Sequence, residues 1–337
     1  MRPYPEKPGD ASKDGRRRGK VVFKALVTAA LCALIVWHGD WTSIWTTLKN
    51  TNPLLLAAVF TGMLLGVSIS AYKWQLILSI HGLHFGFDRL HRYYFTSVFF
   101  NNFLPSNIGG DVYRIYQTIR HQPNRAGAVV AVLTERLTGI WALVALAAIG
   151  GALVYAKGSF TPAWLPPVIL VFTAIAILPP LLLTISTRAI SWCLGVKWFP
   201  RKLKKVLALS GDYRHHPAKT VQVIAISFGF HLFTLCWMLI LSLAVGGPSS
   251  LPRLVLGTAI GNLAALIPVS LNGIGLLDGS FIYVMGDLGM PFDTALMMML
   301  LIRGLLIPLS FIGGLFYLRE RKTINLNELR SGKEEGK

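Results

Sequence analysis

The stretch that decides the fold runs from Ser97 to Arg120 and reads SVFFNNFLPSNIGGDVYRIYQTIR. It begins as an apolar segment and continues, after a polar break, as a second helical pattern. Proline ends a helix because it lacks a backbone donor, and adjacent glycines permit a positive φ or close backbone approach. The break contains Pro105, Gly109 and Gly110. The pattern therefore predicts two half-helices, with Asp111 capping the second and Arg114 one turn later on the same face.

The composition is that of a membrane protein. Of the 337 residues, 53% are hydrophobic and 14% are charged, whereas soluble domains carry about 25% charged residues. The formal net charge of +18 would suggest nucleic acid in a soluble protein. In a membrane protein it indicates contact with anionic lipid, because basic residues gather in cytoplasmic loops. The three cysteines form no CxxC pair, so no disulfide framework is predicted.

Apolar segments long enough to cross a bilayer recur along the chain. The predicted spans cover about 21–37, 54–80, 126–155, 164–185, 221–245 and 294–318. Lys73 lies near the end of the second span, where its side chain is expected to snorkel to the membrane surface. Two further apolar segments, 97–120 and 254–284, are interrupted. We expect an all-α membrane helix bundle with about six full spans plus two broken or re-entrant helical elements.

The basic residues predict how this bundle lies in the membrane. If both termini are cytoplasmic and both broken segments are re-entrant, most of the 33 Lys and Arg residues fall on the cytoplasmic side. The first broken segment then opens to the cytoplasm and the second to the outside, as in inverted-repeat transporters. We expect a transmembrane domain at 21–320, between a disordered cytoplasmic tail at 1–20 and a second tail at 321–337.

Charged side chains at membrane depth are costly, so they should cluster. They are Asp111, Arg114, Glu135, Arg136, Asp278 and Arg303. We expect one coupled polar site in which half-helix N-termini and arginines bind an anion such as a phosphate. The alternative is that Glu135 pairs with Arg303 or Arg136 only to hold helices together. His231, within the fifth span, is interpreted as a hydrogen-bonded packing residue.

Two other sequence patterns resemble a metal site and a phosphate-binding loop but are incomplete. His81, His84 and His91 lie close together in sequence, but no cysteine or carboxylate pair completes a metal site. The Gly109-Gly110 pair lacks the GKS/T ending of a phosphate-binding loop. No complete catalytic set can be argued from spacing, and we expect no metal and no cofactor.

Three motifs in order resemble those of the lysylphosphatidylglycerol synthase transmembrane (flippase-like) family. The N-x-x-P-x-x-x-G-G-D-x-x-R pattern is matched by Asn102, Pro105, Gly109, Gly110, Asp111 and Arg114. Glu135-Arg136 with Gly139 resembles its E-R-x-x-G element. The late P-x-S-x-x-G-x-G element is matched by Pro268, Ser270, Gly273 and Gly275. Asp278 stands near the place where the family usually has a glutamate.

The resemblance implies a multi-pass protein of the bacterial plasma membrane that handles or translocates lipids, with these motif residues at the substrate site. Full synthases carry a soluble aminoacyl-transfer domain after the membrane part, which we do not expect here. We therefore expect a lipid transporter, not an enzyme, for anionic phospholipid or for polyprenol or glycolipid intermediates. The alternatives are a lipid-modifying enzyme in which Glu135 or Asp278 is the general base, and an accessory subunit bound to lipid-biosynthesis enzymes. The oligomeric state stays open.

Overall fold

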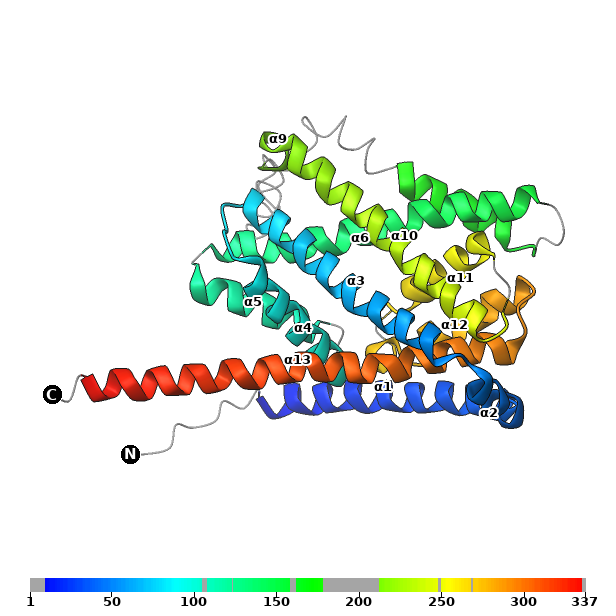
Figure 1. Cartoon of the computed structure of the whole chain (residues 1–337), viewed down its shortest axis with the longest axis horizontal. Helices are drawn as coiled ribbons and strands as arrows, with labels where there is room; N and C mark the ends of the chain where they lie inside the picture. The colour runs from blue at the N-terminus through cyan, green and yellow to red at the C-terminus, as the bar shows by residue number, and fades with distance from the viewer. Residues whose placement is uncertain are drawn as a thin grey trace.

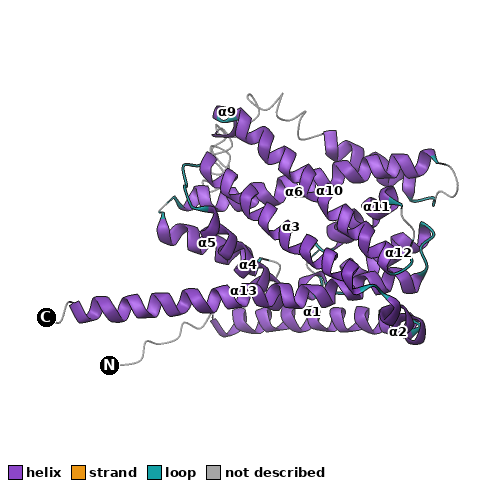
Figure 2. Ribbon diagram, in the orientation of Figure 1, coloured by secondary structure: helices purple, strands orange, loops and turns teal. Residues whose placement is uncertain are grey.

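The computed structural model describes residues 10–104, 108–122, 124–157, 162–177, 212–247, 250–267 and 269–334. Within these ranges the secondary structure is helical and contains no strand (Figure 2). The all-α prediction is confirmed for this part of the chain. Pro105 and Pro268, the prolines of the two breaks, lie outside the described residues.

Four helices are long and apolar enough to cross a membrane, and they confirm four of the predicted spans. They are α3 (Pro53–Ile80), α6 (Arg125–Ala156), α10 (Pro217–Ala244) and the segment Phe292–Glu320 of α13 (Phe292–Glu334). The spans predicted at 21–37 and 164–185 correspond to shorter apolar helices, Val22–Ile35 and Leu165–Ile177. The second of these ends where the described residues stop, so the count of about six spans is not confirmed.

Two of the spanning helices, α3 and α6, begin at side-chain caps. The Asn52 side chain accepts a hydrogen bond from the Leu54 backbone N–H, and Pro53 occupies the first position of α3. The Asn124 side chain accepts one from Gly127 N–H at the start of α6. Both arrangements satisfy donors that have no partner inside the helix.

Each broken segment forms a pair of short helices. The first consists of α4 (Phe87–Phe103) and α5 (Gly109–His121), and the second of α11 (Leu251–Ala264), the 3-10 turn η1 (Leu271–Gly273) and α12 (Leu276–Asp287). The longest, α4, has 17 residues, or about 25 Å, against about 30 Å of bilayer core. The two helices of each pair pack together. Figure 1 shows the pair α4–α5 towards the end of the bundle that holds both termini, and the pair α11–α12 towards the opposite end.

Glycine serves a different purpose in each break. A Cβ at Gly110 would lie 2.2 Å from the Ser97 carbonyl oxygen, so this glycine permits close contact between α4 and α5. Neither Gly109 nor Gly110 has a positive φ, which removes that explanation for the pair. In the second break Gly273 and Gly275 do need the left-handed region, with φ of 69° and 79°.

The terminal helices extend farther than the apolar pattern predicts. The helix α1 (Asp10–His38) begins inside the segment expected to be a disordered tail, and α13 continues to Glu334 through the basic segment after the last span. A span ends where the apolar run ends, but the helix itself stops only where a breaker or a competing contact ends it. After Pro308 no proline follows within α13.

Helix packing brings the two hairpins and the spanning helices together. The closely packed pairs include α3 with α10, α4 with α13, and α6 with α11. Small residues permit these approaches: Gly62 faces Trp237, and Gly313 faces the Phe95 carbonyl. The short helix α2 (Trp41–Asn50), capped by Asp40, closes the end opposite the termini.

Candidate functional site

The centre of the site is the buried guanidinium group of Arg114 on α5. Its NH1 donates to Glu135 Oε2 on α6 at 2.5 Å, and its NH2 donates to Asp111 Oδ1 at 2.6 Å. The rings of Trp74 and Tyr94 lie 5.1 and 4.5 Å from the guanidinium carbon. Two carboxylates and two aromatic faces therefore hold this cation in place.

The same carboxylates bind two more groups. The Tyr94 hydroxyl donates to Glu135 Oε1 at 2.7 Å, and Arg136 Nε contacts Asp111 Oδ2. All four carboxylate oxygens of Asp111 and Glu135 are therefore engaged.

Lys73 on α3 completes this group without touching a carboxylate. Its Nζ donates to the Glu135 backbone carbonyl at 2.9 Å, and the residue is 5% exposed. The expectation that Lys73 snorkels to the membrane surface is therefore wrong. Gly139 lies beside the ammonium, but a Cβ there would be at 3.7 Å, an ordinary van der Waals contact.

Asp278 and Arg303 form a second group. The guanidinium of Arg303 on α13 donates from Nε and NH2 to the two carboxylate oxygens of Asp278 at 3.1 and 3.0 Å. Asp278 Oδ2 also accepts the Gly275 backbone N–H at 2.9 Å, at the start of α12. One carboxylate thus orders the second break and orients Arg303.

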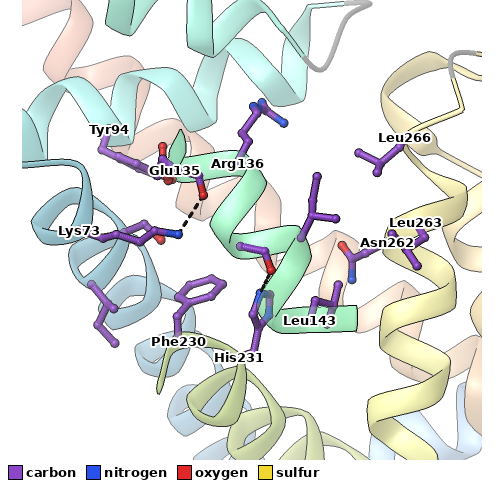
Figure 3. Close-up of a pocket in the computed structure, with 14 residues that line it drawn as sticks. Lys73, Tyr94, Glu135, Arg136, Leu143, Phe230, His231, Asn262, Leu263 and Leu266 are labelled. Carbon is purple, nitrogen blue, oxygen red and sulfur yellow. Dashed lines mark hydrogen bonds between the residues drawn. The ribbon is translucent and has the colours of Figure 1, made fainter. Parts of the chain in front are cut away.

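Two cavities adjoin these groups and share lining residues. The larger, about 560 Å³, lies between the two hairpins, and its lining includes Lys24, Asn102, Arg136, Ser270, Asn272 and Arg303. The smaller, about 250 Å³, is lined by side chains of α3, α4, α6, α10 and α11, among them Lys73, Tyr94, Glu135, His231 and Leu143 (Figure 3). Arg136 and Asn262 line both.

The predicted site residues are distributed over this arrangement as follows. Asp111, Arg114, Glu135 and Arg136 form one ion-paired group, and Asp278 with Arg303 forms another. Arg136 and Arg303 bring the two groups to a common cavity. Glu135 pairs with Arg114, and Arg303 pairs with Asp278, so the Glu135–Arg303 bridge considered from the sequence is not the pairing observed.

The motif residues beside these charges have structural contacts. The Asn102 amide donates to Ser310 Oγ on α13 at 2.9 Å, and the Gly110 backbone N–H donates to Asn101 Oδ1 at 2.8 Å. Asp111 does not cap α5, where Ile108 is the N-cap and makes no side-chain cap. The carboxylate turns to Arg114 and Arg136 because two cations bind it more strongly than backbone donors do.

Sequence reasoning missed Lys73, Trp74, Tyr94 and Asn262. A single lysine in an apolar span, here directly between Tyr72 and Trp74, is interpreted as a snorkelling side chain. Only tertiary packing brings α3 against Glu135. His231 donates from Nε2 to the Gly139 carbonyl at 2.8 Å, which supports its interpretation as a hydrogen-bonded packing residue, although it also lines the smaller cavity. Within the described ranges, no three side chains form a metal-ligand group.

Comparison with known proteins identifies the family to which the chain belongs. Residues 21–314 match the family described as the lysylphosphatidylglycerol synthase TM region. The chain belongs to this family. The matched region contains all of the site residues above, and the chain is therefore an integral membrane protein of a lipid-related family.

A curated relative supports this lysylphosphatidylglycerol synthase TM-region assignment. A protein of Methanothermobacter thermautotrophicus described as a UPF0104 membrane protein is 24% identical over 310 residues. The match covers 84% of this chain and 88% of the relative. The similarity thus extends over nearly the whole length of both proteins.

Proposed function

We propose that this protein translocates anionic membrane lipids, and that the larger cavity is where the lipid phosphate crosses. The observation that carries the proposal is the place of this cavity between two pairs of short helices that lie towards opposite ends of the bundle. Half-spanning elements that meet at mid-depth from opposite sides suit alternating access to one site. The candidate substrates are phospholipids and polyprenol or glycolipid phosphates.

The charge of the cavity lining favours an anion. Lys24, Arg136 and Arg303 line it, and among its described lining residues none is acidic. Asn101, Asn102, Asn262 and Asn272 add amide groups that hydrogen-bond phosphate oxygens or hydroxyls. Ser270 Oγ is buried there without a hydrogen-bond partner among the described residues.

The backbone dipoles of two helix N-termini also favour an anion in the larger cavity. Ile108 at the start of α5 and Leu277 at the start of α12 both line the cavity. A helix N-terminus carries about half a positive charge and free N–H donors. Two such ends beside one cavity favour a negatively charged group there.

The contacts of the acids favour transport over catalysis. A general base needs a free carboxylate oxygen within reach of the substrate. Both oxygens of Glu135 are engaged by Tyr94 and Arg114, and both oxygens of Asp278 by Arg303. A role as an accessory subunit would leave the cationic cavity without a function.

We also propose that the protein lies in the plasma membrane with both termini in the cytoplasm. In this orientation most of the Lys and Arg residues are assigned to the cytoplasmic side, as the positive-inside rule requires. The pair α4–α5 would open to the cytoplasm and the pair α11–α12 to the outside.

The test uses the purified protein in phosphatidylcholine vesicles that contain a trace of fluorescent phosphatidylglycerol in both leaflets. A membrane-impermeant quencher reports how much label reaches the outer leaflet, and mass spectrometry reports any chemical change. We expect faster quenching with the wild-type protein and an unchanged lipid. A chemically modified lipid would support the enzyme instead, and neither movement nor modification would support the accessory subunit.

A further inference from the structure

The buried group around Glu135 carries one more positive charge than negative charge. Its cations are Lys73, Arg114 and Arg136, and its anions are Asp111 and Glu135. Lys73, Arg114 and both acids are at most 8% exposed. The Arg136 side chain is 37% exposed, so the cation that is buried without a carboxylate contact is Lys73. Charges at membrane depth are costly unless they are paired, and an anion beside Lys73 would complete the arrangement.

The excess charge is located at Lys73. The four carboxylate oxygens of Asp111 and Glu135 are occupied by Tyr94, Arg114 and Arg136. Lys73 is held instead by a backbone carbonyl, which uses one of its three N–H donors and supplies no charge. Figure 3 shows its ammonium group at the wall of the smaller cavity, joined to Glu135 by this one contact.

The smaller cavity combines this cation with apolar walls. Ile140, Leu143 and Phe230 are among its apolar residues, and its polar lining residues are Ser70, Lys73, Tyr94, Glu135, Arg136, His231 and Asn262. Its volume of about 250 Å³ is less than half that of the larger cavity. It therefore suits one charged group with the beginning of a hydrocarbon chain, and not a whole lipid or a large hydrated headgroup.

We propose that the smaller cavity is a binding site for a single phosphodiester monoanion of a lipid, with Lys73 as its principal ligand and Arg136 as the residue that connects it to the larger cavity. The site rests on the proposed function, because it is the place where the lipid phosphate stops on its way. One negative charge neutralises the group, which makes a monoanionic phosphodiester a better match than a dianionic monoester or a zwitterion. A headgroup with a positive charge finds no free carboxylate here, because the acids among the described lining and neighbouring residues are already paired.

The test measures the melting temperature of the full chain in phosphatidylcholine nanodiscs with and without phosphatidylglycerol. The Lys73→Gln variant removes the charge but keeps a donor for the Glu135 carbonyl, and Lys73→Arg keeps the charge. The control is Lys49→Gln, on the exposed surface of α2, a helix none of whose residues lines either cavity. A ligand that binds only the folded state stabilises it by RT ln(1 + [L]/Kd), so the melting temperature rises with the ligand concentration.

We expect the stabilisation by phosphatidylglycerol to be lost in Lys73→Gln and retained in Lys73→Arg and Lys49→Gln. The affinity for phosphatidylglycerol, measured by titration, should fall about 10- to 100-fold, as for the loss of a charge-assisted hydrogen bond. In phosphatidylcholine alone, Lys73→Gln should melt no lower than the wild-type protein, because it removes an uncompensated buried charge. A purely structural lysine would give the opposite result there.

Three outcomes would overturn the proposal. They are an undiminished response of Lys73→Gln to phosphatidylglycerol, a lower melting temperature of this variant in phosphatidylcholine alone, and a response to inorganic phosphate without a response to the lipid. The last outcome would assign the site to free phosphate. Lipid binding that depends on Lys73 in a protein that moves no lipid would instead contradict the proposed transport and leave the binding site intact.

Discussion

Arg114 and Glu135 form a buried ion pair 2.5 Å long between α5, in the first hairpin, and α6, a spanning helix. The pair fixes the orientation of the first hairpin, α4–α5, relative to α6. The guanidinium also lies against the rings of Trp74 and Tyr94, so that α3 and α4 are joined to the same point. Four helices therefore depend on one arginine for their relative positions.

Removing one partner of this pair should destabilise the protein strongly. Glu135→Gln and Arg114→Gln each remove one partner of a buried, hydrogen-bonded ion pair, at a cost of about 3–5 kcal/mol. The double variant should lose less than the sum, because the second change removes the charge that the first one leaves behind. Unfolding of the two single variants and the double variant in detergent measures this coupling. Strictly additive losses would contradict the pairing.

Glu135 and Arg303 should behave independently in the same experiment. They share no hydrogen-bond partner among the described residues. The stability losses of Glu135→Gln and Arg303→Gln should therefore add to within about 0.5 kcal/mol. A large interaction energy would show that the two ion-paired groups form one network.

The contribution of Arg303 to activity should depend on the shape of its guanidinium group and not only on its positive charge. It binds both oxygens of Asp278 through two guanidinium nitrogens, a geometry that lysine cannot reproduce. We expect Arg303→Gln to reduce phosphatidylglycerol movement in vesicles by about 10-fold or more, and Arg303→Lys to restore only part of it. Full activity of Arg303→Lys would indicate that charge alone suffices.

Gly110 should not tolerate a side chain. A Cβ would meet the Ser97 carbonyl at 2.2 Å and the Asn101 side chain at 2.8 Å, so α4 and α5 would have to separate. We expect Gly110→Ala to lower stability by about 1–3 kcal/mol. Gly279→Ala in α12 is the matched control, because nothing lies within 4 Å of its Cβ and alanine favours the helix. Thermal unfolding of both variants distinguishes crowding from a general effect of glycine replacement.

The stability of the folded protein should depend on pH in the alkaline range because of Tyr213. Its hydroxyl donates to Thr134 Oγ1 at 2.7 Å and also contacts His81 Nε2, outside the spanning segments. Burial raises the pKa of Tyr213 to about 12. The folded state therefore keeps the proton between about pH 10 and 12 while the unfolded state loses it, and stability should fall as the pH rises through this range. Tyr213→Phe should remove this part of the alkaline slope in a denaturation series, and an unchanged slope would exclude Tyr213 as its source.

The sequence predicts the positions of the two helix breaks well, but it does not predict which side chains pair with the buried charges. Pro105 with the glycine pair, and the late glycines, correctly indicated two pairs of short helices, because breaker residues act locally. The partner of Glu135 could not be found this way, since its ion pair with Arg114 spans 21 positions and depends on how α5 docks on α6. Lys73 shows the same limit: its depth follows from the packing of α3, which hydropathy does not encode. The helical ends of α1 and α13 were missed because apolar runs report membrane contact and not helix length.

The helix α13 packs against both α4 and α12. Arg303 connects it to Asp278 of the second hairpin, and Ser310, seven positions later and about 10 Å along the axis, accepts a hydrogen bond from Asn102 of the first. Pro308 lies between these two attachment points and interrupts the helix ladder there. A helix without proline would be stiff, so that a tilt of one hairpin would also move the other. Because Pro308 cannot donate a backbone hydrogen bond, α13 can bend more easily there, and the two hairpins need not tilt together. Under the proposed transport function, this would allow one hairpin to close while the other opens.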